Sequence, residues 1–260
     1  ITSLNGLLNS FAMCIGCYYL FKNDKRKYIY IIFAVLTLSR QVLITMAIES
    51  FVYNCFISPK EKMNKIICSF SIIAVVGFVL FTLIGNFRSG NGVMKQVFKP
   101  TSAYSDLPES IMWTYSYTEF SLSNFNNLVT MTNGGRNAGL STLKFFLPNA
   151  ITKRIKITPR DNAKYIISDN FNVSTWFPEI YLDFGLFGII VFSVIIGLLG
   201  YYLYSNVFRY KTDKYALLYA VFVHNIIMFF FVNMFLYIPV AFQFAIILLI
   251  FKEKKYERFN

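Results

Sequence analysis

Long apolar runs separated by short basic segments are the feature that most constrains what this chain can fold into. Several runs reach the ~20 residues that cross a hydrocarbon core of ~30 Å. The chain is 56% hydrophobic with a formal net charge of +12, and in a membrane protein clustered Lys and Arg mark cytoplasmic loops. These features exclude an ordinary soluble domain. They predict an all-α polytopic membrane protein with a single domain over residues 1–260.

The apolar runs predict about seven transmembrane segments. They lie at Leu4–Phe21, Tyr28–Ile57 (a hairpin of two short helices), Ile66–Ile84, Phe184–Tyr204 and Tyr215–Phe251, which holds two spans. Basic residues then fall on one side, in the short segments 22–27, 58–65, 209–214 and 252–260. This agreement supports the predicted topology.

The hairpin is the least obvious of these segments. Residues 28–57 would make one helix of ~45 Å, which is long for a single crossing. Arg40 lies near the middle of the run, and a charge at the bilayer centre costs ~3 kcal/mol or more. A hairpin puts Arg40 at the far surface and returns Lys60 and Lys62 to the basic side. We therefore favour the hairpin over a single crossing.

Residues 85–183 form a predicted extracytoplasmic loop of about a hundred residues, which is too long for a simple connection. The positive-inside rule does not govern loops of this length. Within it, Asp106-Leu-Pro-Glu109 predicts a helix start, and Leu140–Leu147 predicts a short helix ended by Pro148. We expect short helices at or near the membrane surface.

The stretch Asn172–Gly188, NVSTWFPEIYLDFGLFG, lies where this loop meets the next span. It places five polar or aromatic residues at the predicted water–lipid boundary: Thr175, Trp176, Glu179, Tyr181 and Asp183. Trp and Tyr favour that depth in a membrane. An acidic side chain there is energetically costly unless it is paired or has a functional role. A functional site and an interfacial anchor with a solvated Asp183 are the two interpretations.

Three arginines are predicted on the outer side: Arg40, Arg88 in GNFRSG, and Arg136 in the turn NGGR. A guanidinium offers a rigid fork of donors that suits phosphate oxygens. Arginines held against a bilayer face therefore predict binding of a lipid-linked phosphate or pyrophosphate. Pairing with lipid headgroups or loop acids is the alternative.

Candidate general bases are the acids Glu119, Glu179 and Asp183. Asp183 beside Tyr181 is the first choice, and a structural role for it stays open. His224, the only histidine, lies in an apolar run and is interpreted as a satisfied interior side chain.

Several motifs are absent from the sequence. It contains no phosphate-binding P-loop, no metal-spaced His or Cys set, and no nucleophile elbow. We therefore predict no cofactor, no metal and no ATP coupling. No basic stretch carries a nucleic-acid-binding motif, so nucleic acid is not an expected partner.

Together these residues give a family resemblance. The hairpin turn Ser39-Arg40, the span ending in GNFRSG, the stretch WTYSYTEFSLSNFNNLV, and Thr175 followed by Tyr181-Leu-Asp-Phe-Gly carry it. The chain resembles the bacterial oligosaccharide repeat-unit polymerases, the Wzy-type O-antigen and capsule polymerases. Members are usually longer, so the resemblance implies that this is the C-terminal part of such a protein.

The resemblance also implies a reaction at the outer face of the bacterial cytoplasmic membrane. One undecaprenyl-pyrophosphate-linked oligosaccharide donates its glycan to the sugar hydroxyl of another. Asp183 or Glu119 would take the acceptor proton. Arg40, Arg88 and Arg136 would stabilise the departing pyrophosphate, and Thr175 and Tyr181 would contact substrate. The implied partners are the lipid-linked oligosaccharides, the bilayer, a chain-length regulator and a flippase.

Two other functions remain open. An O-antigen ligase shares the plan of a large loop between spans, but its usual hallmark is a catalytic histidine in that loop. Residues 85–183 contain no histidine. A polytopic transporter or flippase for lipid-linked sugars would favour internal repeats, and the two halves of the sequence show none.

Overall fold

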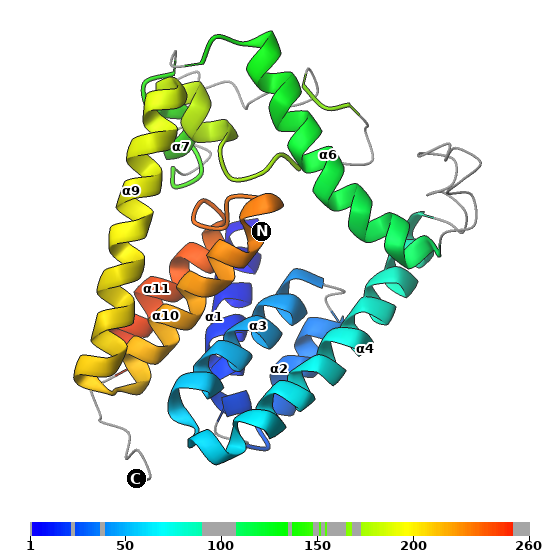
Figure 1. The fold of residues 1–260 in the computed structure, drawn as a ribbon, viewed down its shortest axis with the longest axis vertical. Helices are drawn as coiled ribbons and strands as arrows, with labels where there is room; N and C mark the ends of the chain where they lie inside the picture. The colour runs from blue at the N-terminus through cyan, green and yellow to red at the C-terminus, as the bar shows by residue number, and fades with distance from the viewer. Residues whose placement is uncertain are drawn as a thin grey trace.

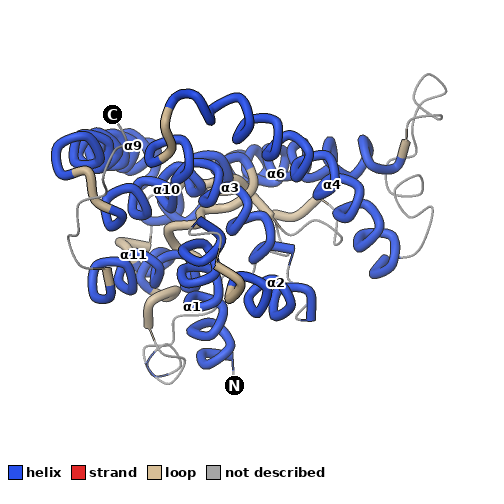
Figure 2. The backbone as a smooth tube through the Cα atoms, turned by 90° about the horizontal axis from the view of Figure 1, so that it is seen from below, coloured by secondary structure: helices blue, strands red, loops and turns tan. Residues whose placement is uncertain are grey.

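A computed structural model describes residues 2–21, 24–36, 40–89, 108–134, 137–147, 165–167 and 173–251, with Ile151 and Arg154. The described chain is all-helical, as predicted, and contains no strands (Figure 2). Its helices are α1 (Thr2–Phe21), α2 (Lys27–Leu36), α3 (Arg40–Ile57), η1 (Lys60–Lys62), α4 (Met63–Ser89), α6 (Glu109–Met131), α7 (Leu140–Leu143), α9 (Pro178–Tyr210), α10 (Asp213–Ile227), η4 (Met228–Phe230) and α11 (Ile238–Ile250).

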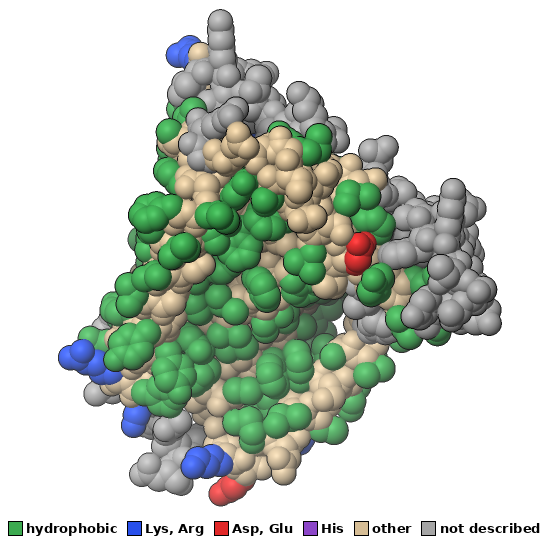
Figure 3. Space-filling model, turned by 45° about the horizontal axis from the view of Figure 1, so that its top comes forward, with side chains coloured by type: hydrophobic (Ala, Val, Ile, Leu, Met, Phe, Trp, Pro, Cys, Tyr) green, Lys and Arg blue, Asp and Glu red, His purple; other side chains and the backbone are tan. Residues whose placement is uncertain are grey.

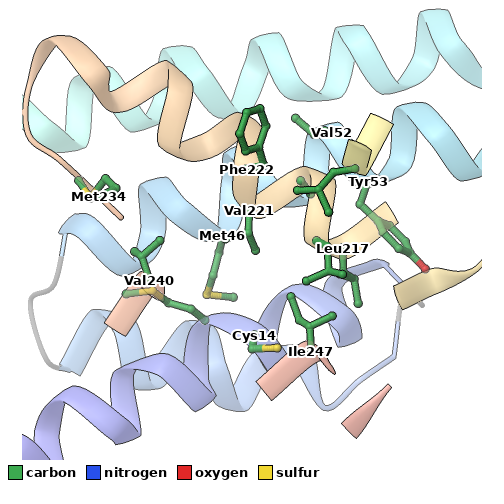
Figure 4. Close-up of a cluster of buried hydrophobic side chains, with 14 of the residues drawn as sticks. Cys14, Met46, Val52, Tyr53, Leu217, Val221, Phe222, Met234, Val240 and Ile247 are labelled. Atoms are coloured by element: carbon green, nitrogen blue, oxygen red, sulfur yellow. The ribbon is translucent and has the colours of Figure 1, made fainter. Parts of the chain in front are cut away.

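Four helices, α1, α3, α10 and α11, pack together in what we call the central bundle (Figure 1). Helix α3 packs against α1 and α10, and α11 packs against α1 and α10. Their buried side chains form one apolar cluster, which includes Met46, Leu217, Val221 and Val240 (Figure 4). Both the first and the last helices of the described chain therefore contribute to the same core.

The predicted hairpin is present as two helices. Helix α2 ends at Leu36, α3 begins at Arg40, and the two pack against each other. They run in opposite directions in Figure 1. The cost of burying Arg40 in one long helix is the physical reason why two helices were predicted.

The basic segments gather at one end of the central bundle, which we call the basic end. The α1–α2 connection, η1 and the α9–α10 connection all lie at the bottom of Figure 1. These segments hold the described Lys25, Arg26, Lys27, Lys60, Lys62, Arg209 and Lys211. The shared location is what a common cytoplasmic side requires.

Helices α4 and α9 expose wide apolar faces on either side of the central bundle. The exposed side chains include Ile72, Val75 and Val79 of α4, and Phe187, Ile190 and Leu198 of α9. Figure 3 shows hydrophobic side chains spread over this side of the molecule, with most of the visible Lys and Arg at its lower edge. Apolar faces of this extent are unfavourable in water and compatible with lipid.

Two described helices are long and apolar enough to cross a membrane, judged by length and composition. They are Pro178–Tyr210 and Asp213–Phe230, the second of which joins α10 to η4. Shorter apolar helices lie at 10–20, 41–57 and 238–250. Helices thus occupy each predicted membrane segment, while the number that spans a bilayer remains a prediction.

Residues 85–183 depart from the prediction in two ways. Helix α6 has 23 residues and is not short. Its start, directly after Pro108, is close to the predicted one. In addition, both predicted bounds fall inside helices, because α4 continues to Ser89 and α9 begins at Pro178. Capping signals predict where a helix starts, whereas tertiary contacts decide how far it continues.

Candidate functional site

The first turns of α9 are the centre of the candidate site. Pro178 occupies the first helical turn, where its missing N–H leaves no intrahelical bond unmade. Two turns later Gly185 adopts φ 66° and ψ −157°, which is not helical and is open only to glycine at low cost. The kink separates residues 178–184, which we call the outer piece of α9, from the long apolar part of the helix. Gly185 thus allows a bend in α9.

Asp183, in the outer piece of α9, holds helix α7. Its Oδ1 accepts a hydrogen bond from the Ser141 amide (2.9 Å), and its Oδ2 accepts bonds from the Thr142 amide (2.9 Å) and hydroxyl (2.6 Å). The side chain is 2% exposed, so it is not the solvated acid of an interfacial anchor. A carboxylate on the first amides of a helix satisfies donors that the helix itself leaves unbonded.

Tyr181, also in α9, contacts the turn that follows α6. Its hydroxyl donates to the carbonyl of Thr132 at 3.3 Å, and a Cβ on Gly134 would come within 2.9 Å of its ring. Gly134 has φ 60°, a left-handed value that favours glycine. One residue later in α9, the Leu182 carbonyl accepts from the Asn137 amide at 3.2 Å. The turn after α6 is therefore seated on α9.

Helix α6 binds the segment that leads into α9 through a buried polar face. Ser121, Asn124 and Leu128 share this face and are fully buried. Asn124 donates to the Val173 carbonyl (2.8 Å) and accepts from the Ile167 amide (2.8 Å). The Ser121 hydroxyl donates to the Phe231 carbonyl (3.0 Å). We call α6, α7, residues 173–177, the outer piece of α9 and the turn 231–237 the polar junction.

Thr175 and Trp176 are the unusual pair in the polar junction. Thr175 has φ 38°, which is costly for a β-branched residue. Both side chains are buried, and neither Thr175 Oγ1 nor Trp176 Nε1 has a hydrogen-bond partner among the described residues. Two adjacent buried donors without partners are an exception in folded proteins, and a ligand oxygen would satisfy them.

The Trp176 ring is fixed by aromatic neighbours. It stacks on Phe235 with ring centroids 5.6 Å apart and meets the edge of Phe192 at 5.3 Å. Asn233 donates to the Trp176 carbonyl at 3.0 Å. Packing of this kind holds the indole in one place, which is what a binding group needs. Trp176 is thus not the exposed interfacial ring that the sequence suggested.

The other predicted site residues are less closely grouped. Glu119 lies on α6, half-buried, and its Oε1 accepts from the Ser123 hydroxyl at 2.7 Å. No hydrogen bond between described residues joins it to Asp183. Arg40 begins α3 and Arg88 lies in the last turn of α4, at helix ends directed away from the basic end (Figure 1). Arg136 lies outside the described residues.

Sequence reasoning missed two groups of polar residues. The first group is the buried polar face of α6. The small polar residues spaced along that helix could have indicated it. The other is Glu49 in α3, which is buried beside His224 in the central bundle. An acid inside an apolar run was a direct signal of an interior site.

Among the described residues, no three His, Cys, Asp or Glu side chains lie close enough to hold a metal ion. Comparison with models of protein families, with curated proteins and with solved structures finds no match to this chain.

Proposed function

We propose that this protein is a multi-pass glycosyltransferase of the bacterial cytoplasmic membrane that polymerises undecaprenyl-pyrophosphate-linked oligosaccharide repeat units. The sugar hydroxyl of one lipid-linked unit attacks the anomeric carbon of another, and the bond from that carbon to the pyrophosphate oxygen breaks. Lipid pyrophosphate leaves, and the hydroxyl proton passes to a carboxylate. Chemistry on the outer face needs no nucleotide sugar, in keeping with a sequence that lacks nucleotide-binding motifs.

The observation that carries this proposal is the position of the two unsatisfied donors. Thr175 and Trp176 lie in the polar junction, where Asn233 of the turn 231–237 donates to the Trp176 carbonyl. This turn directly follows η4. Helix α10 runs from the basic end to η4, so the junction is at the opposite end of the central bundle (Figure 1). If the basic end is cytoplasmic, these donors lie inside the outer end of the protein, on the side where lipid-linked glycans are joined.

The contacts of the two acids favour different roles for them. Asp183 is buried and already accepts three hydrogen bonds, so we assign it as a positioning residue for α7. Glu119 is half-buried, and one of its oxygens accepts no hydrogen bond from the described residues. Glu119 is therefore our candidate for the general base. Arg40, Arg88 and Arg136 remain the candidates for binding pyrophosphate.

The test is polymer length in cells whose own copy of the gene is deleted and replaced by variants of the full-length protein. Glu119→Gln and Arg88→Ala should lower polymerisation at least about 100-fold, the range of a lost general base or charge clamp. Surface glycan should then carry single repeat units. Glu61→Gln and Arg209→Ala, at the basic end, are the matched controls and should give normal polymer.

Membrane abundance of each variant must be measured in parallel, so that loss of protein is not taken for loss of activity. A normal length distribution in both Glu119→Gln and Arg88→Ala cells, at normal abundance, would contradict the proposal.

A further inference from the structure

A row of polar side chains crosses the centre of the apolar bundle. Gln41, Thr45, Glu49 and Tyr53 follow one another along α3 at intervals of four residues, so they lie on one face of the helix. That face packs on α10, which contributes His224. Over 12 residues the row extends ~18 Å along the helix axis, more than half of a hydrocarbon core.

Glu49 and His224 form the centre of the row. Their carboxylate and imidazole atoms, Oε1 and Nδ1, lie 3.7 Å apart, and the side chains are 2% and 0% exposed. The other ring nitrogen, Nε2, lies 3.2 Å from the Thr45 hydroxyl. His224 Nδ1 has no hydrogen-bond partner among the described residues. The interior histidine predicted from sequence is thus buried but only partly satisfied.

The row has a polar contact at each end. Towards the basic end, the Tyr53 hydroxyl donates to Asp213 Oδ1 at 2.6 Å, where α10 begins. Figure 4 shows this hydroxyl at the edge of the apolar cluster, well away from Met234 and Val240. Towards the opposite end, the Gln41 amide contacts Thr45 Oγ1 (3.1 Å) and Met234 Sδ (3.6 Å).

Burial limits the charge that the central pair can carry. An uncompensated charge in a dry core is costly, so a net charge of zero on Glu49 and His224 is strongly preferred. A neutral imidazole and an ionised carboxylate together carry one negative charge. One additional proton, on either group, makes the pair neutral overall. Among the surrounding helices, α1 contributes Cys14, which interacts electrostatically with Glu49, and α11 contains no titratable side chain.

We propose that Glu49 and His224 form a proton-binding site in the centre of the bundle, loaded from the basic end through Asp213 and Tyr53. Asp213 takes a proton from water, and the Tyr53 hydroxyl accepts it while giving its own proton towards Glu49. Glu49 lies one helical turn from Tyr53, with Cβ atoms roughly 5–6 Å apart. The proposed step from the Tyr53 hydroxyl to Glu49 therefore includes one bridging water molecule. One proton moves and no bond to carbon changes, so no oxidant or reductant is required.

The single histidine makes the site directly measurable. In the full chain, labelled with ¹⁵N-histidine and reconstituted in lipid vesicles, the ring nitrogen signals report the protonation of His224 from about pH 5 to about pH 8. No glycan substrate is needed, so failure here is distinguishable from failure of the proposed polymerase activity. Glu49→Gln should change the ring signals, because the shared proton is lost.

The route is tested by the exchange of the ring proton with deuterated solvent. Tyr53→Phe removes the hydroxyl and keeps the ring, and it should slow exchange at least about 10-fold. Tyr219→Phe, on α10 and outside the row, is the matched control and should exchange like the wild type. Equal rates in Tyr53→Phe and Tyr219→Phe would overturn the route. Unchanged ring signals in Glu49→Gln would overturn the shared proton.

Discussion

The central bundle and the polar junction are stabilised in different ways. The bundle is held by apolar side chains from α1, α3, α10 and α11, which fill space between helices. In the junction, side chains such as Asn124, Asn233 and Asp183 bind the backbone of non-helical segments. The bundle is therefore specified by volume, and the junction by individual hydrogen bonds.

The difference follows from what each region must satisfy. A helix bonds its own backbone groups, so packed helices need only complementary shape. Segments 165–167 and 173–177 have no such internal bonds, and each of their buried N–H and C=O groups needs a partner. Polar side chains at fixed positions supply those partners. Among the described residues, only the side-chain atoms Thr175 Oγ1 and Trp176 Nε1 of segment 173–177 stay buried without a partner.

Removing volume from the bundle should have the largest effect. Leu217 is 2% exposed within the apolar cluster, and Leu217→Ala should lower the free energy of unfolding by about 3–5 kcal/mol, since neighbours fill the cavity only partly. Leu249, which is 85% exposed on α11, is the matched control, and Leu249→Ala should cost little. Unfolding by detergent titration measures both. Equal costs would show that the bundle is not specified by its packing.

Removing one acceptor from the junction should have the next largest effect. Asp183→Ala leaves the Ser141 and Thr142 amides without their acceptor, which should cost about 2–3 kcal/mol and release α7. Hydrogen exchange of those amides measures the release, while the bundle amides should stay protected. Unchanged exchange would show that the contact does not hold α7.

A variant that keeps the carboxylate separates positioning from base catalysis. Thr142→Val removes the 2.6 Å hydrogen bond to Asp183, and Thr142→Ser retains a hydroxyl. If Asp183 positions α7, Thr142→Val should lower polymer length and Thr142→Ser should not. Normal polymer in Thr142→Val cells would show that this hydrogen bond is not needed for activity.

Backbone strain in the junction should have a smaller effect. Gly134→Ala puts a Cβ at positive φ and within 2.9 Å of Tyr181, so it should destabilise the junction by about 1–2 kcal/mol. Gly197→Ala in α9 meets nothing within 4 Å and should be neutral or slightly stabilising. Proteolysis at the turn after α6 measures the difference. A neutral Gly134→Ala would mean that the turn is not seated on Tyr181.

The smallest effect should come from the exposed pair Asp24–Arg26 at the basic end, in the connection between α1 and α2. Hydrogen bonds from Arg26 lower the pKa of Asp24 from its usual value to about 2. The folded form therefore gains stability above the usual pKa, and this gain is lost as the pH falls towards about 2. Asp24→Asn should remove that dependence, as seen in thermal midpoints over the acidic range. Identical acid profiles in the two proteins would contradict the pair.

The sequence predicted the helices better than the contacts. Apolar runs gave α1, α9 and α10 close to their observed positions, and the cost of burying Arg40 predicted the break between α2 and α3. The length of α6 was not predictable from sequence, because its polar residues indicate a solvent-exposed face. In the structure, segment 173–177 covers that face. For the same reason, Trp176 and Asp183 were expected at a wet boundary and are buried.

Composition and spacing alone determined that this chain is helical, strongly apolar and basic in a few short segments, because those properties depend only on neighbours along the chain. The tertiary structure decided which polar groups meet. It placed Asp183 on α7, Glu49 beside His224, and Thr175 in a strained conformation over α6. Each of these contacts joins residues distant in sequence, and local patterns carry no information about such pairs.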